Sequence, residues 1–302
     1  MGKMRSEKGF ALILALLITA ILVAVIGEAV YSVHAGALNA SSARDTLRGS
    51  LLADGGVELA SKALKALNDD QGYTYLSRTD SERVIPAGDG SLSIKVEDEQ
   101  AKLSLMVAYK NGELNSGLYD AYERLIDALR LGKDLPEALA DWIDSDDAAR
   151  RGGAETNDWY GRLAPPFASK NGQPDSVDEL RLVKGYTPTT MKKLSPFVTV
   201  YTDGLVNINT APKEVLRALS DEITEEMAER VIKYRERTPF EDTAGIRKVA
   251  GFETLGFSLQ GRITVKSDIF RIISRGEYNE GGREVESIVD VSSSKVLYRR
   301  VR

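Results

Sequence analysis

A cluster of oxygen-bearing side chains lies in two short segments of this 302-residue chain, residues 144–147 and 155–158. Carboxylate and amide oxygens are the ligands that hard cations such as Ca²⁺ prefer, and Ca²⁺ takes roughly six to eight of them. The two segments therefore predict a calcium site. The residues of ligand type are Asp144, Asp146, Asp147, Glu155, Asn157 and Asp158.

The spacing of these residues differs from that of an EF-hand. Asp144, Asp146 and Glu155 would fall at the first, third and twelfth positions of such a loop. Residues 148–150 are Ala-Ala-Arg, whereas an EF-hand places further ligands and its turn glycine there. A calcium site in this segment would therefore need a different loop geometry.

The alternative to a cation site is a solvated acidic loop in which Arg150 and Arg151 act as internal counter-ions. Composition alone does not separate the two interpretations. Aromatic and proline residues follow the acidic segments and favour a loop folded onto a helical bundle, where clustered carboxylates would repel one another without a cation. These residues are Trp159, Tyr160, Pro165, Pro166 and Phe167.

Other kinds of chemistry find little support in the composition. The chain has no cysteine, which excludes thiol nucleophiles and disulfide bonds, and its one histidine, His34, has no partner histidine for a zinc site. Paired carboxylates of the acidic loop could serve an anchored hydrolase as acid and base, but no nucleophile accompanies them. A net charge of −5 argues against a protein built to hold nucleic acid. We expect no enzymatic activity.

Several elements must position the acidic loop, and the first is a membrane anchor at the N-terminus. The apolar run from Phe10 to Gly27 contains no charged residue and, as a helix, is long enough to cross most of a bilayer core. Lys3, Arg5 and Lys8 precede it, so the N-terminus should stay cytoplasmic while the rest is exported. A plain single-pass anchor is the alternative to a processed leader.

The basic leader, the Gly9-Phe10 pair and the apolar helix that follows resemble a type IV prepilin leader. This resemblance implies that a prepilin peptidase cuts after Gly9 and methylates the new N-terminus at Phe10. Most pilin-like proteins carry a glutamate at the fifth residue after the cut, and here that residue is Leu14. Because an unpaired carboxylate is costly in hydrocarbon, Leu14 fits a subunit at the tip of a fibre, with no other subunit ahead of it.

The anchor should continue as an amphipathic helix to about Leu67, because apolar residues recur at helical spacing beyond Gly27. The Gly55-Gly56 pair should weaken this helix locally, and the polar run that begins at Asn68 should end it. We expect the outer half of the helix to pack under a sheet.

The strands of that sheet are separated in the sequence. Residues 91–96 alternate between polar and apolar side chains, as a half-buried strand does, and Leu103 and Leu105 resume the alternation after a turn. A long and mostly helical insertion therefore divides the sheet. The matching strands are predicted near the C-terminus, at residues 270–278, 285–291 and 296–301.

The insertion contains a diverged repeat. Residues 125–143 of the first copy match residues 215–232 of the second, and the segment around Arg181 matches the segment around Arg247. The first copy holds extra residues between Asp144 and Pro174, which include the acidic loop. We therefore expect two small helical bundles, one of them with an added loop.

The second copy resembles helix-hairpin-helix modules, including those of DNA-binding competence proteins. Residues 206–212, Val-Asn-Ile-Asn-Thr-Ala-Pro, carry this resemblance, with Thr210 expected to cap a helix that begins at Pro212. In the DNA-binding versions a glycine-rich hairpin lets backbone amides approach phosphate. This chain has Asp221 and Glu222 at that place, so we expect no nucleic-acid binding.

Taken together, these features resemble the K-type minor pseudopilins of bacterial type II secretion systems, over nearly the whole chain. Leu14 and the split sheet support the resemblance, as do several short motifs. Ser104 and Met106 stand where family members often have asparagines, which leaves the resemblance intact. The motifs lie at residues 96–99, 102–103, 141–144, 165–167, 179–185 and 207–212.

The resemblance implies an α+β fold. A long N-terminal helix would pack on an antiparallel, pilin-like sheet, and the insertion would form two SAM-like or helix-hairpin-helix-like bundles. The expected divisions are a leader (1–9), a transmembrane and spine helix (10–70), the first part of the sheet (71–105), a first helical subdomain (106–200, with the acidic loop at 144–174), a second helical subdomain (201–260) and the remaining strands (261–302).

By the same resemblance, the protein would cap a periplasmic pseudopilus, form a tip complex with I- and J-type minor pseudopilins, help to start assembly, and bind Ca²⁺ in its helical part. It would be a single-pass inner-membrane protein whose other partners are the prepilin peptidase and the inner-membrane secretion platform. A minor pilin of a type IV pilus is the nearest rival, and a membrane-tethered DNA-uptake protein is a more distant one. The sequence alone does not distinguish a subunit of a secretion system from a subunit of a type IV pilus.

Overall fold

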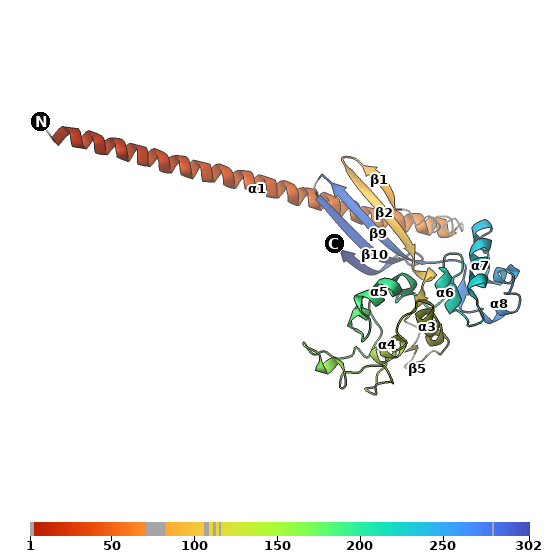
Figure 1. Ribbon diagram of the computed structural model, residues 1–302. Helices are drawn as coiled ribbons and strands as arrows, with labels where there is room; N and C mark the ends of the chain where they lie inside the picture. Colours follow the sequence, from red (N-terminus) through yellow and green to blue (C-terminus); the bar gives the residue numbers. More distant parts are fainter. Residues whose placement is uncertain (1–2, 70–81, 106–108, 111–112, 115, 280) are drawn as a thin grey trace.

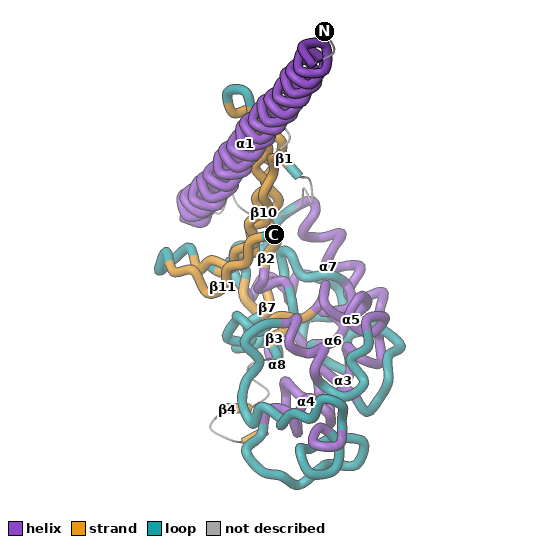
Figure 2. The backbone as a smooth tube through the Cα atoms, turned by 90° about the vertical axis from the view of Figure 1, so that its left-hand side faces the viewer, coloured by secondary structure: helices purple, strands orange, loops and turns teal. Residues whose placement is uncertain are grey.

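The computed structural model describes residues 3–69, 82–105, 109–110, 113–114, 116–279 and 281–302. One helix of 67 residues, α1 (Lys3–Asp69), extends far beyond the rest of the molecule, and its C-terminal part lies on a sheet (Figure 1). The prediction that this helix continues past Gly27 is confirmed. Figure 2 shows the helical part of the chain beyond the sheet, on the side away from α1.

The sheet has five strands in the order β1-β2-β9-β10-β11, and every neighbouring pair is antiparallel. Strands β2 and β9 lie side by side although the whole helical part separates them in sequence, so the predicted division of the sheet is confirmed. The strands are β1 (Arg83–Ala87), β2 (Gly90–Asp98), β9 (Ile269–Tyr278), β10 (Gly281–Asp290) and β11 (Lys295–Val301).

Small residues let α1 approach the sheet closely. A Cβ added at Gly56 would overlap the Ser274 hydroxyl, and a Cβ at Gly276 would overlap the backbone of α1 at Gly49. Ala60, one turn beyond Gly56, is buried in the same interface. Of the glycine pair that was expected to weaken the helix, Gly56 therefore provides room for close packing, Gly55 faces away from the sheet, and α1 continues through both.

Leu103 and Leu105 do not resume the sheet, so that prediction is wrong. After β2 the chain turns through η1 (Glu99–Ala101), and the short strand β3 (Leu103–Ser104) pairs in parallel with β6 (Val198–Thr199). Both leucines are buried in the helical part. Alternation shows that a segment has a buried face, but it does not show which core receives that face. Met106 lies outside the described residues.

The helical part forms two lobes, each with its own apolar core. The first lobe comprises residues 103–202 and begins and ends with the strand pair β3–β6. A small hairpin also belongs to it. Its elements are β4 (Tyr109–Lys110), β5 (Glu113–Leu114), α3 (Ser116–Ala128), α4 (Leu135–Ile143), η2 (Tyr160–Arg162), η3 (Val177–Leu182), α5 (Pro188–Leu194) and η4 (Ser195–Phe197).

The second lobe comprises residues 206–265 and also begins and ends with a short parallel strand pair, β7–β8. The repeat predicted from the sequence is therefore visible in the fold. Gly185 and Gly251, equivalent in the repeat, have positive φ angles of 86° and 97°. Its elements are β7 (Val206–Asn207), α6 (Lys213–Ala218), α7 (Glu225–Arg237), η5 (Thr243–Lys248), α8 (Leu255–Ser258) and β8 (Ile263–Thr264).

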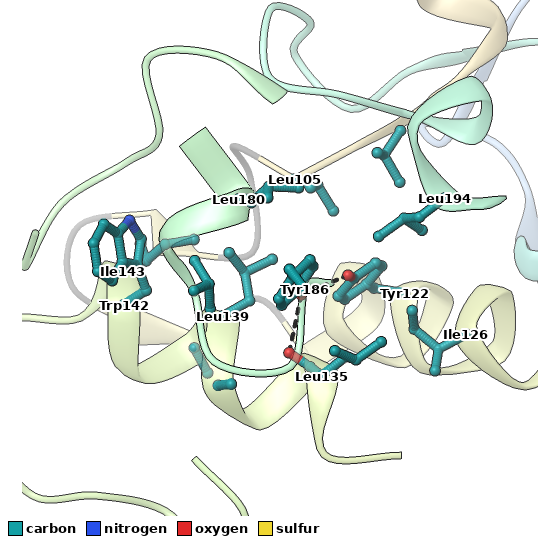
Figure 3. Packing of buried hydrophobic residues seen from close by; sticks show 14 of the residues in the cluster. Leu105, Tyr122, Ile126, Leu135, Leu139, Trp142, Ile143, Leu180, Tyr186 and Leu194 are labelled. Atoms are coloured by element: carbon teal, nitrogen blue, oxygen red, sulfur yellow. Dashed lines mark hydrogen bonds between the residues drawn. The ribbon is translucent and has the colours of Figure 1, made fainter. Parts of the chain in front are cut away.

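Buried tyrosines join the helices of the first lobe (Figure 3). The hydroxyl of Tyr186 donates to the Leu135 carbonyl oxygen at 3.0 Å and lies 2.7 Å from the hydroxyl of Tyr122. These contacts connect α3, the first turn of α4 and the segment after η3. Because the polar ends of both rings are paired inside the core, neither ring needs to reach solvent.

Two acidic residues at the end of β2 connect the sheet to the lobes. Asp98 Oδ2 accepts hydrogen bonds from Thr210 Oγ1 at 2.5 Å and from Ser267 Oγ at 2.9 Å. Glu99, fully buried, accepts from Arg271 of β9 and from Thr199 of β6. The 207–212 motif thus fixes the second lobe to the sheet. It also follows that Thr210 does not cap the next helix, contrary to prediction.

The residue at the N-cap of α6 is Pro212, and it forms no side-chain capping bond. The hydroxyl of Thr210 is instead used by Asp98, more than a hundred positions earlier in the chain. The local sequence does not contain that partner. The predicted α+β class is confirmed: a long helix on an antiparallel sheet, with helical lobes inserted between two strands.

Candidate cation site

The acidic loop begins where α4 ends. Asp144 is the C-cap residue of α4, and its N–H donates to the Ala140 carbonyl oxygen at 3.0 Å. Trp142, in the last turn, packs edge-on against Tyr160, with ring centroids 5.2 Å apart. Tyr160 in turn lies 5.3 Å from the ring of Phe167. The aromatic residues therefore hold the loop against the helices that form the lobe.

This packing confirms the predicted folding of the loop for Tyr160, which is fully buried, and for Phe167, which is half-buried. Trp159, Pro165 and Pro166 are exposed, so for them the prediction is wrong. The segment from 161 to 166 is exposed throughout. The loop thus packs onto the lobe at residues 153–155 and at Tyr160, Phe167 and Ser169, while residues 145–149 and 161–166 face solvent.

Three of the predicted ligands come together. Carboxylate oxygens of Asp144, Asp146 and Glu155 lie within 4.8 Å of one another. Asp144 is 7% exposed and Glu155 is 1% exposed, whereas Asp146 is on the surface. Asp144 Oδ1 and Glu155 Oε1 have no hydrogen-bond partner among the described residues. Since buried carboxylate oxygens are costly when unpaired, these two atoms fit a site that a cation completes.

The other oxygen of Glu155 is fixed by the protein. Glu155 Oε2 accepts a hydrogen bond of 2.9 Å from the hydroxyl of Ser169. The Ser169 N–H donates to Thr156 Oγ1 at 2.9 Å, which ties the two sides of the loop together. Glu155 is therefore held by one oxygen, and the second oxygen is available to a ligand.

The electrostatics of the cluster are those of carboxylates gathered away from water. Burial raises the pKa of Glu155 to about 7; the nearby charges of Asp141 and Asp144 add to this rise, and the Ser169 hydrogen bond opposes it. Burial also raises the pKa of Asp144, while its hydrogen bond to Arg150 acts in the opposite direction. Both groups resist ionisation here, and a bound cation would remove that resistance.

An aspartate and an arginine that were not among the predicted ligands organise the site. Asp141 is fully buried, and its Oδ2 accepts from the backbone N–H groups of Arg150 at 3.0 Å and Ala154 at 2.8 Å. Arg150 Nη1 donates to Asp141 Oδ1 at 2.7 Å and also to Asp144 Oδ2. Arg150 is thus the internal counter-ion that the alternative interpretation predicted, whereas Arg151 is exposed.

The remaining predicted ligands, Asp147, Asn157 and Asp158, are exposed, and the two aspartates lie outside the group of three. Asp158 Oδ1 accepts from the Glu155 N–H at 2.7 Å, so it stabilises the turn that presents Glu155. A role for these three residues as ligands stays a prediction. Lys184, which the sequence did not indicate, donates to the Gly153 carbonyl oxygen at 2.8 Å and closes the loop from outside.

The N-terminal part of α1 has the character of a membrane anchor. One window of 18 residues has a mean hydropathy of 3.0, and none of it is buried in the fold. Phe10 and Leu14 are exposed on this helix, and the predicted cut between Gly9 and Phe10 falls inside it. The cleavage, the methylation and the significance of Leu14 stay predictions.

Comparison with known protein families finds a match for each of the two lobes. Two sequence models of type II secretion system protein K match residues 101–203 and 206–266, which together make up more than half of the chain. The chain belongs to the protein K family of type II secretion systems. The two matched segments correspond to the two lobes, so the family relationship includes the acidic loop. The resemblance predicted from the sequence is confirmed.

Protein K sequences from several bacteria align with this chain. The protein from Pseudomonas aeruginosa is 31% identical over 158 residues, which are 50% of this chain and 46% of that protein. The protein from Aeromonas hydrophila is 28% identical over 254 residues, 76% of each chain. The alignment thus spans about half of the first relative and three quarters of the second.

A solved structure resembles the fold. It is a chain of the GspK-GspI-GspJ complex from the type II secretion system of enterotoxigenic Escherichia coli, with a TM-score of 0.61 and 18% identity. The match covers 82% of this chain and 98% of that one. At this identity the likeness shows a shared fold and nothing more.

Proposed function

We propose that this protein K family member is a minor pseudopilin at the tip of the type II secretion pseudopilus, where it helps to start assembly and supports protein export. The family relationship supports secretion over the rival role in a type IV pilus. The proposed role requires positioning and assembly and no bond-making step. Neither catalysis nor nucleic-acid binding is needed for it.

The insertion of two lobes into the sheet is the observation that carries the tip assignment. Both lobes follow β2 and precede β9, and they lie beyond the sheet on the side away from α1 (Figure 2). A subunit within a fibre must be surrounded by neighbours, and this bulk would block them. Leu14 agrees with a terminal position, because a subunit with nothing ahead of it has no ammonium group to neutralise.

The proposed partners are I- and J-type minor pseudopilins. The similar solved chain was crystallised as a GspK-GspI-GspJ complex. In this chain α1 exposes apolar side chains well beyond the membrane segment, among them Leu38, Leu47 and Leu51. Exposed apolar positions on a helix favour packing against other helices. We assign this surface to the α1 helices of the partners.

The proposed topology follows from the anchor. The N-terminus lies in the cytoplasm, α1 crosses the inner membrane once, and the sheet and lobes lie in the periplasm. Prepilin peptidase cuts after Gly9, Phe10 becomes the methylated N-terminus, and the inner-membrane secretion platform lifts the subunit into the pseudopilus. The exposed apolar segment of α1 supports the membrane part of this proposal.

The proposed cation site belongs to the first lobe. Asp144, Asp146 and Glu155 would hold Ca²⁺, because they offer closely spaced carboxylate oxygens and no softer ligand. The two unpartnered buried oxygens support this proposal. A bound cation would supply charge compensation and would connect the end of α4 to the far side of the loop. Its role would be structural.

The tip position can be tested by labelling the chain on assembled pseudopili. An epitope tag at the exposed C-terminus and gold-labelled antibody would show where subunits lie. The proposal expects label at one end of each fibre and co-purification with the I- and J-type proteins. Label along the length of the fibre would contradict the tip assignment, and loss of export in a strain without the chain would test the secretion role separately.

A further inference from the structure

We infer that Arg150 is a built-in counter-ion that holds the acidic loop together without metal and weakens the binding of a divalent cation. The inference rests on the proposed cation site and concerns what sets its affinity. It starts from the arginine side chain, which lies inside the carboxylate cluster. In a loop tuned for the tightest cation binding, that position would carry a neutral group.

Arg150 is attached to the cluster through several contacts. Its Nη1 donates to Asp141 Oδ1 at 2.7 Å and to Asp144 Oδ2, and its Nε lies 3.9 Å from Glu137 Oε2. Its backbone N–H donates to Asp141 Oδ2 at 3.0 Å. Main chain and side chain of one residue therefore bind the same carboxylate. This geometry fixes the guanidinium beside Asp144, one of the proposed ligands.

The guanidinium cannot leave its position without cost. Asp141 is fully buried, and removing its ionic partner would leave a charge away from water. A cation that binds Asp144 Oδ1 and Glu155 Oε1 would therefore bind next to a positive charge that stays in place. Like charges a few ångströms apart repel strongly where water is partly excluded. Arg150 must then lower the affinity of the site.

The same contacts explain why the loop can be ordered before a cation binds. Four carboxylates meet here, and Arg150 compensates part of their charge. The uncompensated part is what a divalent cation would neutralise. The structure assigns Arg150 the role of setting how much charge is left for the cation. The four are Asp141, Asp144, Asp146 and Glu155.

Substitution of Arg150 tests the inference, with Arg151 as a matched control. Arg150→Gln and Arg151→Gln remove the same charge from adjacent positions, but Arg151 is exposed. Calcium binding to the full chain in detergent would be measured by calorimetry, and melting temperature would be measured in chelator. We expect Arg150→Gln to bind Ca²⁺ about tenfold more tightly. Arg151→Gln should change the affinity by about twofold or less, because solvent screens its charge.

In chelator, Arg150→Gln should melt at a lower temperature than the natural chain, because its carboxylates have lost their counter-ion. Calcium should then raise the melting temperature of this variant more than that of the natural chain. Circular dichroism would show whether the variant is folded. This second measurement separates a change in cation affinity from a general loss of structure.

The outcomes distinguish this inference from the proposed cation site. If the natural chain and Arg150→Gln bind Ca²⁺ equally, the inference fails and the cation site stands. If only Arg150→Gln binds, the inference is supported and cation binding by the natural chain is excluded. If neither folded protein binds Ca²⁺, both ideas fall. A tenfold gain shared by Arg151→Gln would also overturn the inference, since it would reflect net charge alone.

Discussion

The buried polar side chains of the two lobes differ in how their atoms are paired. In the second lobe Asn209 donates to the carbonyl oxygens of Phe240 and Val265 at 2.9 and 3.0 Å, and its own oxygen accepts from the Phe240 N–H. In the first lobe Asp144 and Glu155 each keep one buried oxygen without a partner among the described residues. Asn209 is thus paired entirely within the second lobe. The two carboxylates of the first lobe leave oxygens for a ligand.

The difference lies in one inserted loop, since the rest of the plan is shared. Leu180 and Ile246 are equivalent in the repeat and are both buried in the centre of their lobes. Tyr186 and Phe252 are likewise equivalent and buried. The repeat therefore supplies two apolar cores, and the acidic loop adds the proposed cation site to one of them. Both lobes attach to the end of β2, the first through Glu99 and the second through Asp98.

The largest effect is expected from removing equivalent core residues. Leu180→Ala and Ile246→Ala should each destabilise their own lobe by about 4 kcal/mol, because each leaves a cavity in a packed core. If cation binding belongs to the first lobe, Ca²⁺ should raise the first melting transition of Leu180→Ala and leave that of Ile246→Ala unchanged. Scanning calorimetry of the full chain with calcium and with chelator measures both.

Equal rescue of the two variants by Ca²⁺ would contradict the comparison. It would mean either that the lobes unfold as one unit or that cations bind to both. Leu163→Ala in the exposed part of the loop provides a control, because an exposed leucine leaves no cavity when shortened.

The next largest effect is the pH dependence of stability that Glu155 gives to the first lobe. The pKa of Glu155 is about 7 in the folded chain against 4.5 as its ordinary value, so the folded state binds the extra proton between these pH values. Without a cation, stability should therefore be lost as the pH rises from 4.5 through 7, by at most about 3 kcal/mol. Denaturant unfolding in chelator, from pH 5 to pH 8, measures this loss.

Glu155→Gln should remove that part of the pH dependence, because the amide does not titrate. In the natural chain, saturating Ca²⁺ should also reduce it, since the cation favours the ionised carboxylate. A variant whose stability still falls with pH as steeply as that of the natural chain would show that another group is responsible.

Local and periodic signals in the sequence were enough to predict most of the fold. The apolar run after Gly9 predicted the anchor, alternation predicted β2, and the strands that match it near the C-terminus correspond to β9, β10 and β11. The repeat predicted two bundles. Leu103 and Leu105 were misplaced because their pairing partner, β6, is almost a hundred residues away, and no local pattern identifies it.

The site was predicted in part for a similar reason. Residue type identified the acidic segments. Separation along the sequence did not show that Asp144, Asp146 and Glu155 would come together in space, or that Asp147 and Asn157 would face solvent. The supporting residues come from three other places. Asp141 precedes the loop on α4, Ser169 lies in the later part of the loop, and Lys184 belongs to the repeat itself. Their roles depend on long-range packing, which the sequence pattern does not encode locally.

The smallest effect is expected at a position whose equivalent in the other lobe carries a different residue. Lys184 of the first lobe is equivalent to Ala250 of the second, which has no acidic loop. The Lys184 ammonium donates to the Gly153 carbonyl oxygen at 2.8 Å and lies 4.7 Å from the centroid of the Trp159 ring. Both contacts are made to the loop. The lysine therefore occurs in the lobe that has an acidic loop, and the lobe without one has alanine at the equivalent position.

Lys184→Ala therefore gives the first lobe the residue of the second. It should weaken closure of the loop by about 1 kcal/mol, because it removes one charge-assisted hydrogen bond and one cation–π contact. Hydrogen exchange should become several-fold faster in residues 150–160 and stay unchanged in the core of the lobe. Faster exchange across the whole lobe would assign Lys184 to the core, and no change would leave the aromatic packing of Tyr160 and Phe167 as the support of the loop.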